Sequence, residues 1–174
     1  MATTYTLISS VTVGSGGAAN IEFTSIPGIY TDLLVKVSAR SNRNVFAASA
    51  IDLRFNSNSA NYNTQNLLKE SGTVSTGGAT GGTEAGIGYI SQDTDTANTF
   101  GSAEIYIPNY TSSNNKSFSV ETVQENNGAT QYMQLTAGLW SNSAAITSIA
   151  FRIFTGSFNF KQYSTAYLYG ISNA

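Results

Sequence analysis

Apolar and polar residues alternate with a period of two along most of the chain, which is the pattern of β-strands with one buried face. The clearest run covers residues 31–40, where Leu33, Val35, Val37 and Ala39 share one side of an extended strand. The residues between them share the other side. We expect the first set to face the core and the second set, which includes Arg40, to face solvent.

The same alternation recurs in eight further segments. They cover residues 5–13, 21–23, 51–55, 103–107, 118–122, 133–139, 149–153 and 166–169. In residues 133–139 the apolar set is Met133, Leu135, Ala137 and Leu139, and the pattern predicts that these side chains face the core. In residues 166–169, Ala166 and Leu168 face away from Tyr167 and Tyr169.

Glycine, proline and asparagine separate these runs. Turn residues lie at 14–17 (GSGG), 26–28 (IPG) and 126–128 (NNG), and Asn-Gly is a strong hairpin signal. About ten strands and no helices are predicted, which indicates an all-β antiparallel sandwich of jelly-roll type forming a single domain over residues 1–174. Residues 71–83 contain five glycines and no charge, and are predicted to form a mobile surface loop or one ordered by a neighbour.

Composition excludes several function classes. The chain has no Cys and no His, so no Ser-His-Asp triad, thiolate nucleophile or zinc finger can form. A net charge of −2 argues against nucleic-acid binding, and no apolar run is long enough to span a membrane. The first 13 residues lack the pattern of a signal peptide. We therefore expect synthesis in a reducing cytoplasm and no nucleic-acid or membrane partner.

Carboxylates are the only candidate catalytic groups. Glu104 and Glu121 are a conceivable pair for glycoside hydrolysis, although both are typical of solvent-facing strand positions. Asp93 and Asp95, with Asn98, could supply oxygen ligands to calcium, but Asp is also common in turns. The sequence favours the structural interpretation in both cases, and predicts no enzyme activity, catalytic residue, metal or cofactor.

The positions expected to face solvent have an unusual amino-acid composition. Ser, Thr and Asn account for 61 of 174 residues, whereas charged residues account for only 10%. Such side chains lose little conformational entropy on docking and form hydrogen bonds without desolvating a charge. The aromatic residues Tyr163, Tyr167, Tyr169 and Trp140 are candidate interface residues, because tyrosine and tryptophan are common in subunit contacts. The pattern indicates a protein that docks onto copies of itself or onto a scaffold.

Several segments resemble small β-sandwich virion proteins of tailed phages, including cyanophages and other marine phages. The resemblance is carried by residues 4–14 (TYTLISSVTVG), 98–101 (NTFG), 105–110 (IYIPNY), 137–142 (AGLWSN), 145–149 (AITSI) and 163–171 (YSTAYLYGI). It implies a structural protein of the virion, on the capsid or on a fibre.

The predicted function is therefore a capsid decoration (cement) protein, a homotrimer that binds the major capsid protein and stabilises the outer shell. One alternative is the tip of a tail or head fibre that binds a host-surface glycan through Trp140 and residues 71–83. A further alternative is a polysaccharide depolymerase that uses Glu104 and Glu121.

Overall fold

A computed structural model describes residues 4–45, 48–154 and 157–172, and this part of the chain is all β. The strands are β1 (Tyr5–Thr12), β2 (Asn20–Phe23), β3 (Asp32–Ala39), β4 (Ser49–Phe55), β5 (Tyr62–Glu70), β6 (Thr73–Gly82), β7 (Ala85–Ile90), β8 (Gly101–Ile107), β9 (Lys116–Gln124), β10 (Tyr132–Trp140), β11 (Ile149–Ile153) and β12 (Thr165–Ile171).

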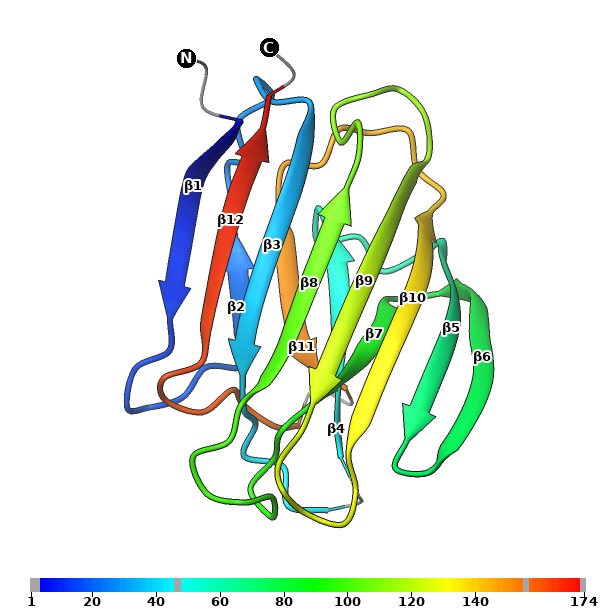
Figure 1. Cartoon of the computed structure of the whole chain (residues 1–174). Helices are drawn as coiled ribbons and strands as arrows, with labels where there is room; N and C mark the ends of the chain where they lie inside the picture. The colour runs from blue at the N-terminus through cyan, green and yellow to red at the C-terminus, as the bar shows by residue number, and fades with distance from the viewer. Residues whose placement is uncertain (1–3, 46–47, 155–156, 173–174) are drawn as a thin grey trace.

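The strands form two antiparallel sheets, shown in Figure 1. The larger sheet has the order β1-β12-β3-β8-β9-β10-β5-β6, and the smaller has the order β2-β11-β4-β7. The pairing is nested: β1 pairs with β12, β2 with β11, β3 with β8, and β4 with β7. Two hairpins, β5–β6 and β9–β10, are inserted into this nest and extend the larger sheet.

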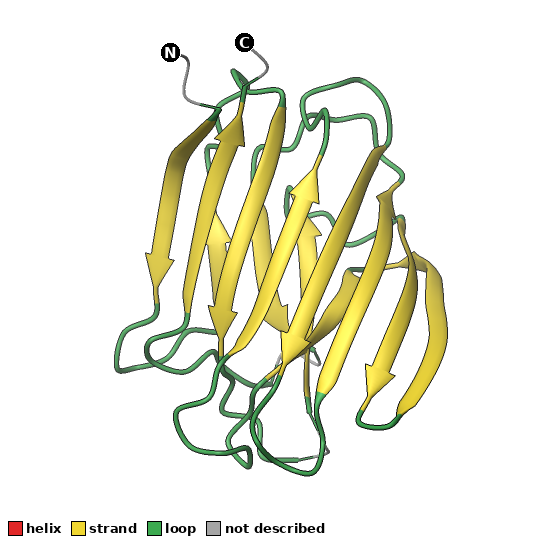
Figure 2. Ribbon diagram, in the orientation of Figure 1, coloured by secondary structure: helices red, strands yellow, loops and turns green. Residues whose placement is uncertain are grey.

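The core lies between the two sheets. Its largest fully buried side chains include Phe23, Phe55, Phe151, Phe160 and Trp140, contributed by both sheets and the loops. Burying apolar surface at about 25 cal/mol per Å² is the main stabilising contribution to such a fold. In Figure 2 the smaller sheet lies behind the middle of the larger one, while the β5–β6 hairpin extends past it.

The prediction of an all-β chain with two antiparallel sheets is confirmed, and most strands lie where the alternation placed them. Leu33, Val35, Val37 and Ala39 are all buried, as expected. The Asn127–Gly128 turn lies in the loop that joins β9 to β10, and these strands pair as a hairpin. The number of strands was underestimated, because β5, β6 and β7 alternate weakly or contain several glycines.

Residues 71–83 were predicted to form a surface loop, either mobile or ordered by a neighbour, and the assignment as a loop is wrong. Residues Thr73–Gly82 form β6, which pairs with β5 at the edge of the larger sheet. Three glycines of this segment lie close to other backbone or side-chain atoms. A Cβ on Gly78, for example, would be 2.5 Å from the Thr64 carbonyl oxygen. The glycines therefore permit close packing of β6 on β5 rather than flexibility.

The face of β10 is also opposite to the predicted one. Met133 and Leu135 are exposed, whereas Tyr132 and Trp140 point into the core. Trp140 stacks on Tyr62 with ring centroids 6.2 Å apart, and Gly138 leaves room for the Phe118 ring. Both faces of this strand carry apolar residues, so alternation alone could not choose between them, and the large aromatic rings occupy the core.

A register irregularity between Leu7 and Ser9 produces the same effect in β1. Before it, Tyr5 and Leu7 are more than half exposed; after it, Val11 packs against the core. The extra residue shifts the alternation by one, and so the two halves of a continuous period-two pattern lie on opposite faces of the sheet.

Candidate functional site

The outer face of the larger sheet, directed away from the smaller sheet, is the first candidate site. One row of paired residues crosses all eight strands of this face. From β1 to β6 the row contains Ser10, Tyr167, Lys36, Glu104, Glu121, Leu135, Leu67 and Thr76. Of the twelve large apolar side chains that are exposed in the described residues, eight lie on this face. The face is therefore much more apolar than the remaining surface.

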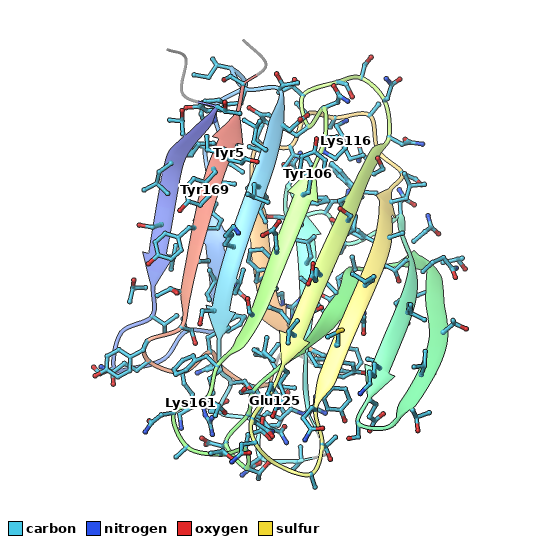
Figure 3. The ribbon with its side chains drawn as sticks, in the orientation of Figure 1. Tyr5, Tyr106, Lys116, Glu125, Lys161 and Tyr169 are labelled. Atoms are coloured by element: carbon cyan, nitrogen blue, oxygen red, sulfur yellow. The ribbon has the colours of Figure 1, made fainter. Side chains whose placement is uncertain are left out.

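These apolar side chains form two groups, one at each side of the sheet. The tyrosine patch contains the exposed residues Tyr5, Leu7, Tyr106 and Tyr167, together with half-buried Tyr169 and buried Leu34, on β1, β12, β3 and β8. The aliphatic patch contains Leu67, Val74, Met133 and Leu135, on β5, β6 and β10. Figure 3 shows Tyr5, Tyr169 and Tyr106 near the end of the sheet that carries both termini.

Tyr106 is held in place by the buried carboxylate of Asp32. The Tyr106 hydroxyl donates to Asp32 Oδ2 at 2.8 Å, and Asp32 Oδ1 accepts from the Asn109 backbone N–H at 2.8 Å. This hydrogen bond to Asp32 raises the pKa of Tyr106, so the ring remains neutral. An ordered, uncharged aromatic ring loses little entropy when it contacts a partner.

Charges separate the two patches. Lys36 forms an ion pair with Glu104, with 2.6 Å between Lys36 Nζ and Glu104 Oε2, and both side chains are about half exposed. Glu121 lies directly opposite Glu104 on the neighbouring strand. The two carboxylates considered for glycoside hydrolysis thus come together, but on an open sheet face where both are exposed to solvent. A carboxylate pair used for hydrolysis works in a cleft that holds the sugar between the two groups. The hollow beside Glu104 is lined by Tyr5, Leu34, Lys36 and Tyr169, and Glu121 is not part of its lining.

The predicted interface residues are distributed over different environments. Tyr167 is 40% exposed and Tyr169 is half-buried, both on the outer face, while Tyr163 is 69% exposed in the turn before β12. Trp140 is only 1% exposed and contacts Phe55 and Tyr62 in the core. Its predicted contact with a partner or glycan is thus incompatible with this fold, because the indole ring would first have to leave the core.

A polar hollow forms the second candidate site. It lies between residues 91–100 and the turn at 161–164, has a volume of about 330 Å³, and is lined by Arg40, Asp93, Asp95, Ala97, Asn98, Phe100, Lys161, Gln162 and Tyr163. Lys161 forms an ion pair with Asp93 across it. Tyr163 has a φ of 72°, a left-handed conformation that is uncommon for an aromatic residue. Its backbone N–H donates to the Val13 carbonyl at 3.0 Å, which holds the exposed ring at the rim.

Arg40 organises this hollow, and alternation had placed it on the solvent face. Its side chain is buried, and the guanidinium donates to the backbone carbonyls of Thr96 and Thr99 at 2.9 Å and of Asp95 at 3.0 Å. The Arg40 carbonyl accepts from the Lys161 N–H at 2.7 Å. One residue thus connects both loops, and the only sequence signal was a basic residue at the end of a strand.

The residues that were weighed as calcium ligands, and for which the sequence favoured a structural role, form other contacts. Asp95 Oδ2 accepts from the Gln92 backbone N–H at 2.8 Å and from Gln124 Nε2 at 2.9 Å, and Asp93 pairs with Lys161. Within the described ranges, no group of three or more acidic residues is placed to hold a metal ion. The same residues contain no helix that is long and apolar enough to cross a membrane.

A charged cluster on the exposed side of the smaller sheet was not predicted. Glu84 Oε2 accepts a hydrogen bond from Arg152 Nη1 at 3.3 Å and forms an ion pair with Arg54, whose Nε lies 3.0 Å away. Asp52 lies on the strand next to Arg152 and is only 3% exposed. Burial, with the neighbouring Glu84 carboxylate, raises the pKa of Asp52 to about 7, and the two arginines only partly oppose this. Nothing in the sequence around Asp52 indicates that its side chain is buried or that its pKa is raised.

Asp52 makes stability depend on pH in an unusual direction. The pKa of Asp52 is about 7 in the folded state and about 4 in an unfolded chain. The folded state therefore binds this proton more tightly than the unfolded chain does. The resulting contribution to the free energy of unfolding is complete below pH 4 and is lost as the pH rises through 7. Raising the pH from 5 to 8 should lower the free energy of unfolding by about 2–3 kcal/mol through this group. Urea denaturation at both pH values should show that Asp52→Asn removes this decrease. An equal decrease in the wild type and the variant would contradict the assignment.

No family model matches the chain, and neither a curated protein nor a solved structure matches it. The functional proposal below therefore rests on the fold, on the residues described above and on the sequence resemblance.

Proposed function

We propose that this chain is a structural, non-enzymatic protein of a tailed-phage particle, used as a capsid decoration protein. The observation that carries the docking role is the outer face of the larger sheet, with its tyrosine and aliphatic patches. Exposed apolar side chains that are grouped on one face indicate an interaction surface, whereas singly scattered ones do not. The virion setting rests on the sequence resemblance, and the major capsid protein is the proposed partner.

The mechanism proposed for the shell is mechanical. A decoration protein that contacts two neighbouring capsid subunits binds the assembled shell more tightly than the separate subunits. By linkage, this preferential binding stabilises the assembled state against disassembly. The apolar patches supply area that is removed from water on docking, and Lys36, Glu104 and Glu121 between them supply orientation.

We also propose that the fold is a jelly roll with two inserted hairpins. If β5, β6, β9 and β10 are set aside, the remaining strands have the orders β1-β12-β3-β8 and β2-β11-β4-β7. This arrangement of two four-stranded sheets with nested antiparallel pairs is that of a double Greek key. Such sandwiches are common in capsid proteins, and so the topology supports the proposed role by analogy.

Copy number in purified particles tests the decoration role. A decoration protein should be present in a number comparable with that of the major capsid protein, whereas a fibre protein should be a small fraction of it. Quantitative mass spectrometry of the particle measures this ratio. A ratio typical of a fibre would contradict the decoration role.

Leu135→Glu should weaken docking to shells that lack the protein by at least about tenfold, because it places a charge in the aliphatic patch. Leu135 is 53% exposed, so the substitution should leave the fold intact. Thr24→Glu is the matched control, since Thr24 is exposed after β2, outside the outer face. Co-sedimentation with the shells measures binding, and equal binding of both variants would contradict docking through this face.

The second candidate function is binding of a host-surface glycan at a fibre tip, and the polar hollow favours it. The exposed Tyr163 ring can stack on the apolar face of a sugar, while Asp93, Asn98 and Lys161 offer groups to its hydroxyls. Uncommon backbone conformations such as that of Tyr163 often occur at binding sites. These residues replace Trp140 and residues 71–83 as the proposed contacts.

Tyr163→Ala should reduce glycan binding by at least about tenfold if the hollow is a saccharide site, since stacking on the ring would be lost. An array of bacterial surface polysaccharides measures binding, and Tyr5→Ala is the control because Tyr5 is similarly exposed but lies in the tyrosine patch. Binding that survives Tyr163→Ala, or no binding by the wild type, would contradict this function.

A further inference from the structure

Strand β6 forms an open edge of the larger sheet. It pairs with β5 on one side only, and the sheet ends on the other side. Its first nine residues are exposed, so neither of its faces is covered by another part of the described chain. Figure 1 shows the β5–β6 hairpin at the side of the molecule, beyond β7 of the smaller sheet. Backbone N–H and C=O groups therefore line an accessible edge of ten residues.

This edge lacks the features that usually prevent strands from pairing with other molecules. The segment TVSTGGATGG contains no charge and no proline. Residues 73–79 pair with β5 in a regular register, and the register shifts only beyond Ala79. Natural edge strands are typically protected by lysine, proline, bulges or short length. An additional strand would satisfy the edge and stabilise the hairpin.

The opposite edge of the same sheet is different. Strand β1 is also uncharged, but its register irregularity between Leu7 and Ser9 interrupts the edge in the middle of the strand. A bulge of this kind twists an edge and limits its pairing. Of the two open edges of the larger sheet, β6 is thus the one suited to continuous pairing.

We propose that β6 pairs antiparallel with β6 of a second copy of the chain, about a two-fold axis near Thr76, to form one continuous sheet. In this register Val74 of each copy lies opposite Gly78 of the other, and Thr76 lies opposite Thr76. Every such pair joins small or β-branched residues, and no like charges face each other. The regular stretch from Thr73 to Ala79 spans roughly 24 Å.

Symmetry and the place of the aliphatic patch favour a second copy as the occupant. Antiparallel pairing of a strand with itself is isologous, so it closes after two copies and leaves no new open β6 edge. The pairing also brings the aliphatic patches of both copies together, because Val74 lies at the edge and Leu67, Leu135 and Met133 lie next to it on the outer face. The result would be a wider apolar face than one copy provides. A two-fold pair differs from the trimer expected from the sequence, and the molecular mass of the assembly in solution distinguishes a dimer from a trimer.

Sedimentation velocity of the full chain tests the pairing with two matched variants. Thr76→Lys and Ser10→Lys place a lysine at the two ends of the same cross-sheet row, one in β6 and one in β1, and both sites are exposed. We expect a wild-type dimer, a dissociation constant raised at least about tenfold by Thr76→Lys, and no change with Ser10→Lys. A monomeric or trimeric wild type, or loss of the dimer with Ser10→Lys, would overturn the proposal.

A cysteine probe tests the register independently. The chain contains no cysteine, so Thr76→Cys introduces the only thiol. Residues directly opposite each other in antiparallel strands lie within the Cα separation that a disulfide needs. Mild oxidation should convert most of the Thr76→Cys protein to a covalent dimer and little of the Ser10→Cys control. Equal cross-linking of both variants would overturn pairing through β6. Neither result affects the proposed docking role, which is measured on shells.

Discussion

Replacing Gly88 with alanine is expected to lower the free energy of unfolding by about 3–5 kcal/mol. Gly88 has a φ of 131°, which L-residues rarely adopt, and it lies at a register irregularity where β7 pairs with β4. An added Cβ would be 2.0 Å from Thr122 Oγ1 and 2.7 Å from Thr122 Cβ. The substitution thus combines backbone strain with a collision in a region that has no room to relax.

The collision also affects a link between the two sheets. Thr122 is on β9 of the larger sheet, and its hydroxyl donates to the Ile87 carbonyl on β7 of the smaller sheet at 2.7 Å. Moving the Thr122 side chain would leave two buried polar groups without this bond. Gly86→Ala is the control on the same strand, because its Cβ would only touch Asp52 Oδ1 at 3.7 Å. Urea denaturation measures both, and equal stability of the two variants would contradict the explanation.

Arg40→Met should also lower the free energy of unfolding by about 3–5 kcal/mol. Methionine keeps much of the aliphatic length but has no donors, so the carbonyls of Asp95, Thr96 and Thr99 lose their bonds to the guanidinium. Each polar group left without a partner costs about 1–3 kcal/mol when water cannot replace the bond. Residues 91–100 should then lose their fixed conformation.

Hydrogen exchange separates this local effect from a general loss of stability. Backbone amides of residues 93–99 should exchange faster in Arg40→Met than those of the core strands. Lys36→Met is the control, because the exposed ion pair of Lys36 with Glu104 should contribute less than about 1 kcal/mol. Unchanged exchange at residues 93–99 in Arg40→Met would contradict the role given to the guanidinium.

Alternation predicted strands well where only one face of a strand is apolar. In β3 the predicted core positions, such as Val35, are correct, because Lys36 and Ser38 make the other face more polar, although Leu34 on that face is also buried. In β12 alternation separated Leu168 from Tyr167 without choosing which of them faces the core, and the structure buries Leu168. In β10 both faces carry apolar residues, and the choice depends on whether Trp140 can stack on Tyr62, a contact between distant segments. In β1 a single extra residue reversed the pattern.

The prediction of β6 failed for a different reason. Gly-rich segments are usually flexible, and no local property of TVSTGGATGG indicates a strand. Its order depends on β5, which lies beside it and whose Gln65 and Asn66 side chains need glycines opposite them. Strand formation here is a result of pairing, and pairing is not visible in composition.

The candidate sites were predicted only in part. Alternation correctly separated Tyr167 and Tyr169 from Ala166 and Leu168, but it did not choose which set faces the core. The structure leaves Tyr167 exposed and Tyr169 half-buried on the outer face. Arg40, Asp52 and Lys116 were missed, because each is a charged residue that the fold buries. Lys116, labelled in Figure 3, donates from Nζ to the Ser112 carbonyl at 2.7 Å, and burial lowers its pKa. Such contacts depend on loop conformations that short-range patterns do not encode.

Hydroxyl-radical footprinting of the free protein and of the protein on the particle locates the docking surface. Tyrosine and methionine react readily, and Tyr106, Tyr167 and Met133 are all exposed on the outer face. We predict strong protection of these three side chains on the particle, while Tyr163 at the polar hollow stays reactive. Protection of Tyr163 with unchanged reactivity of Tyr106, Tyr167 and Met133 would show that the chain does not dock through the outer face.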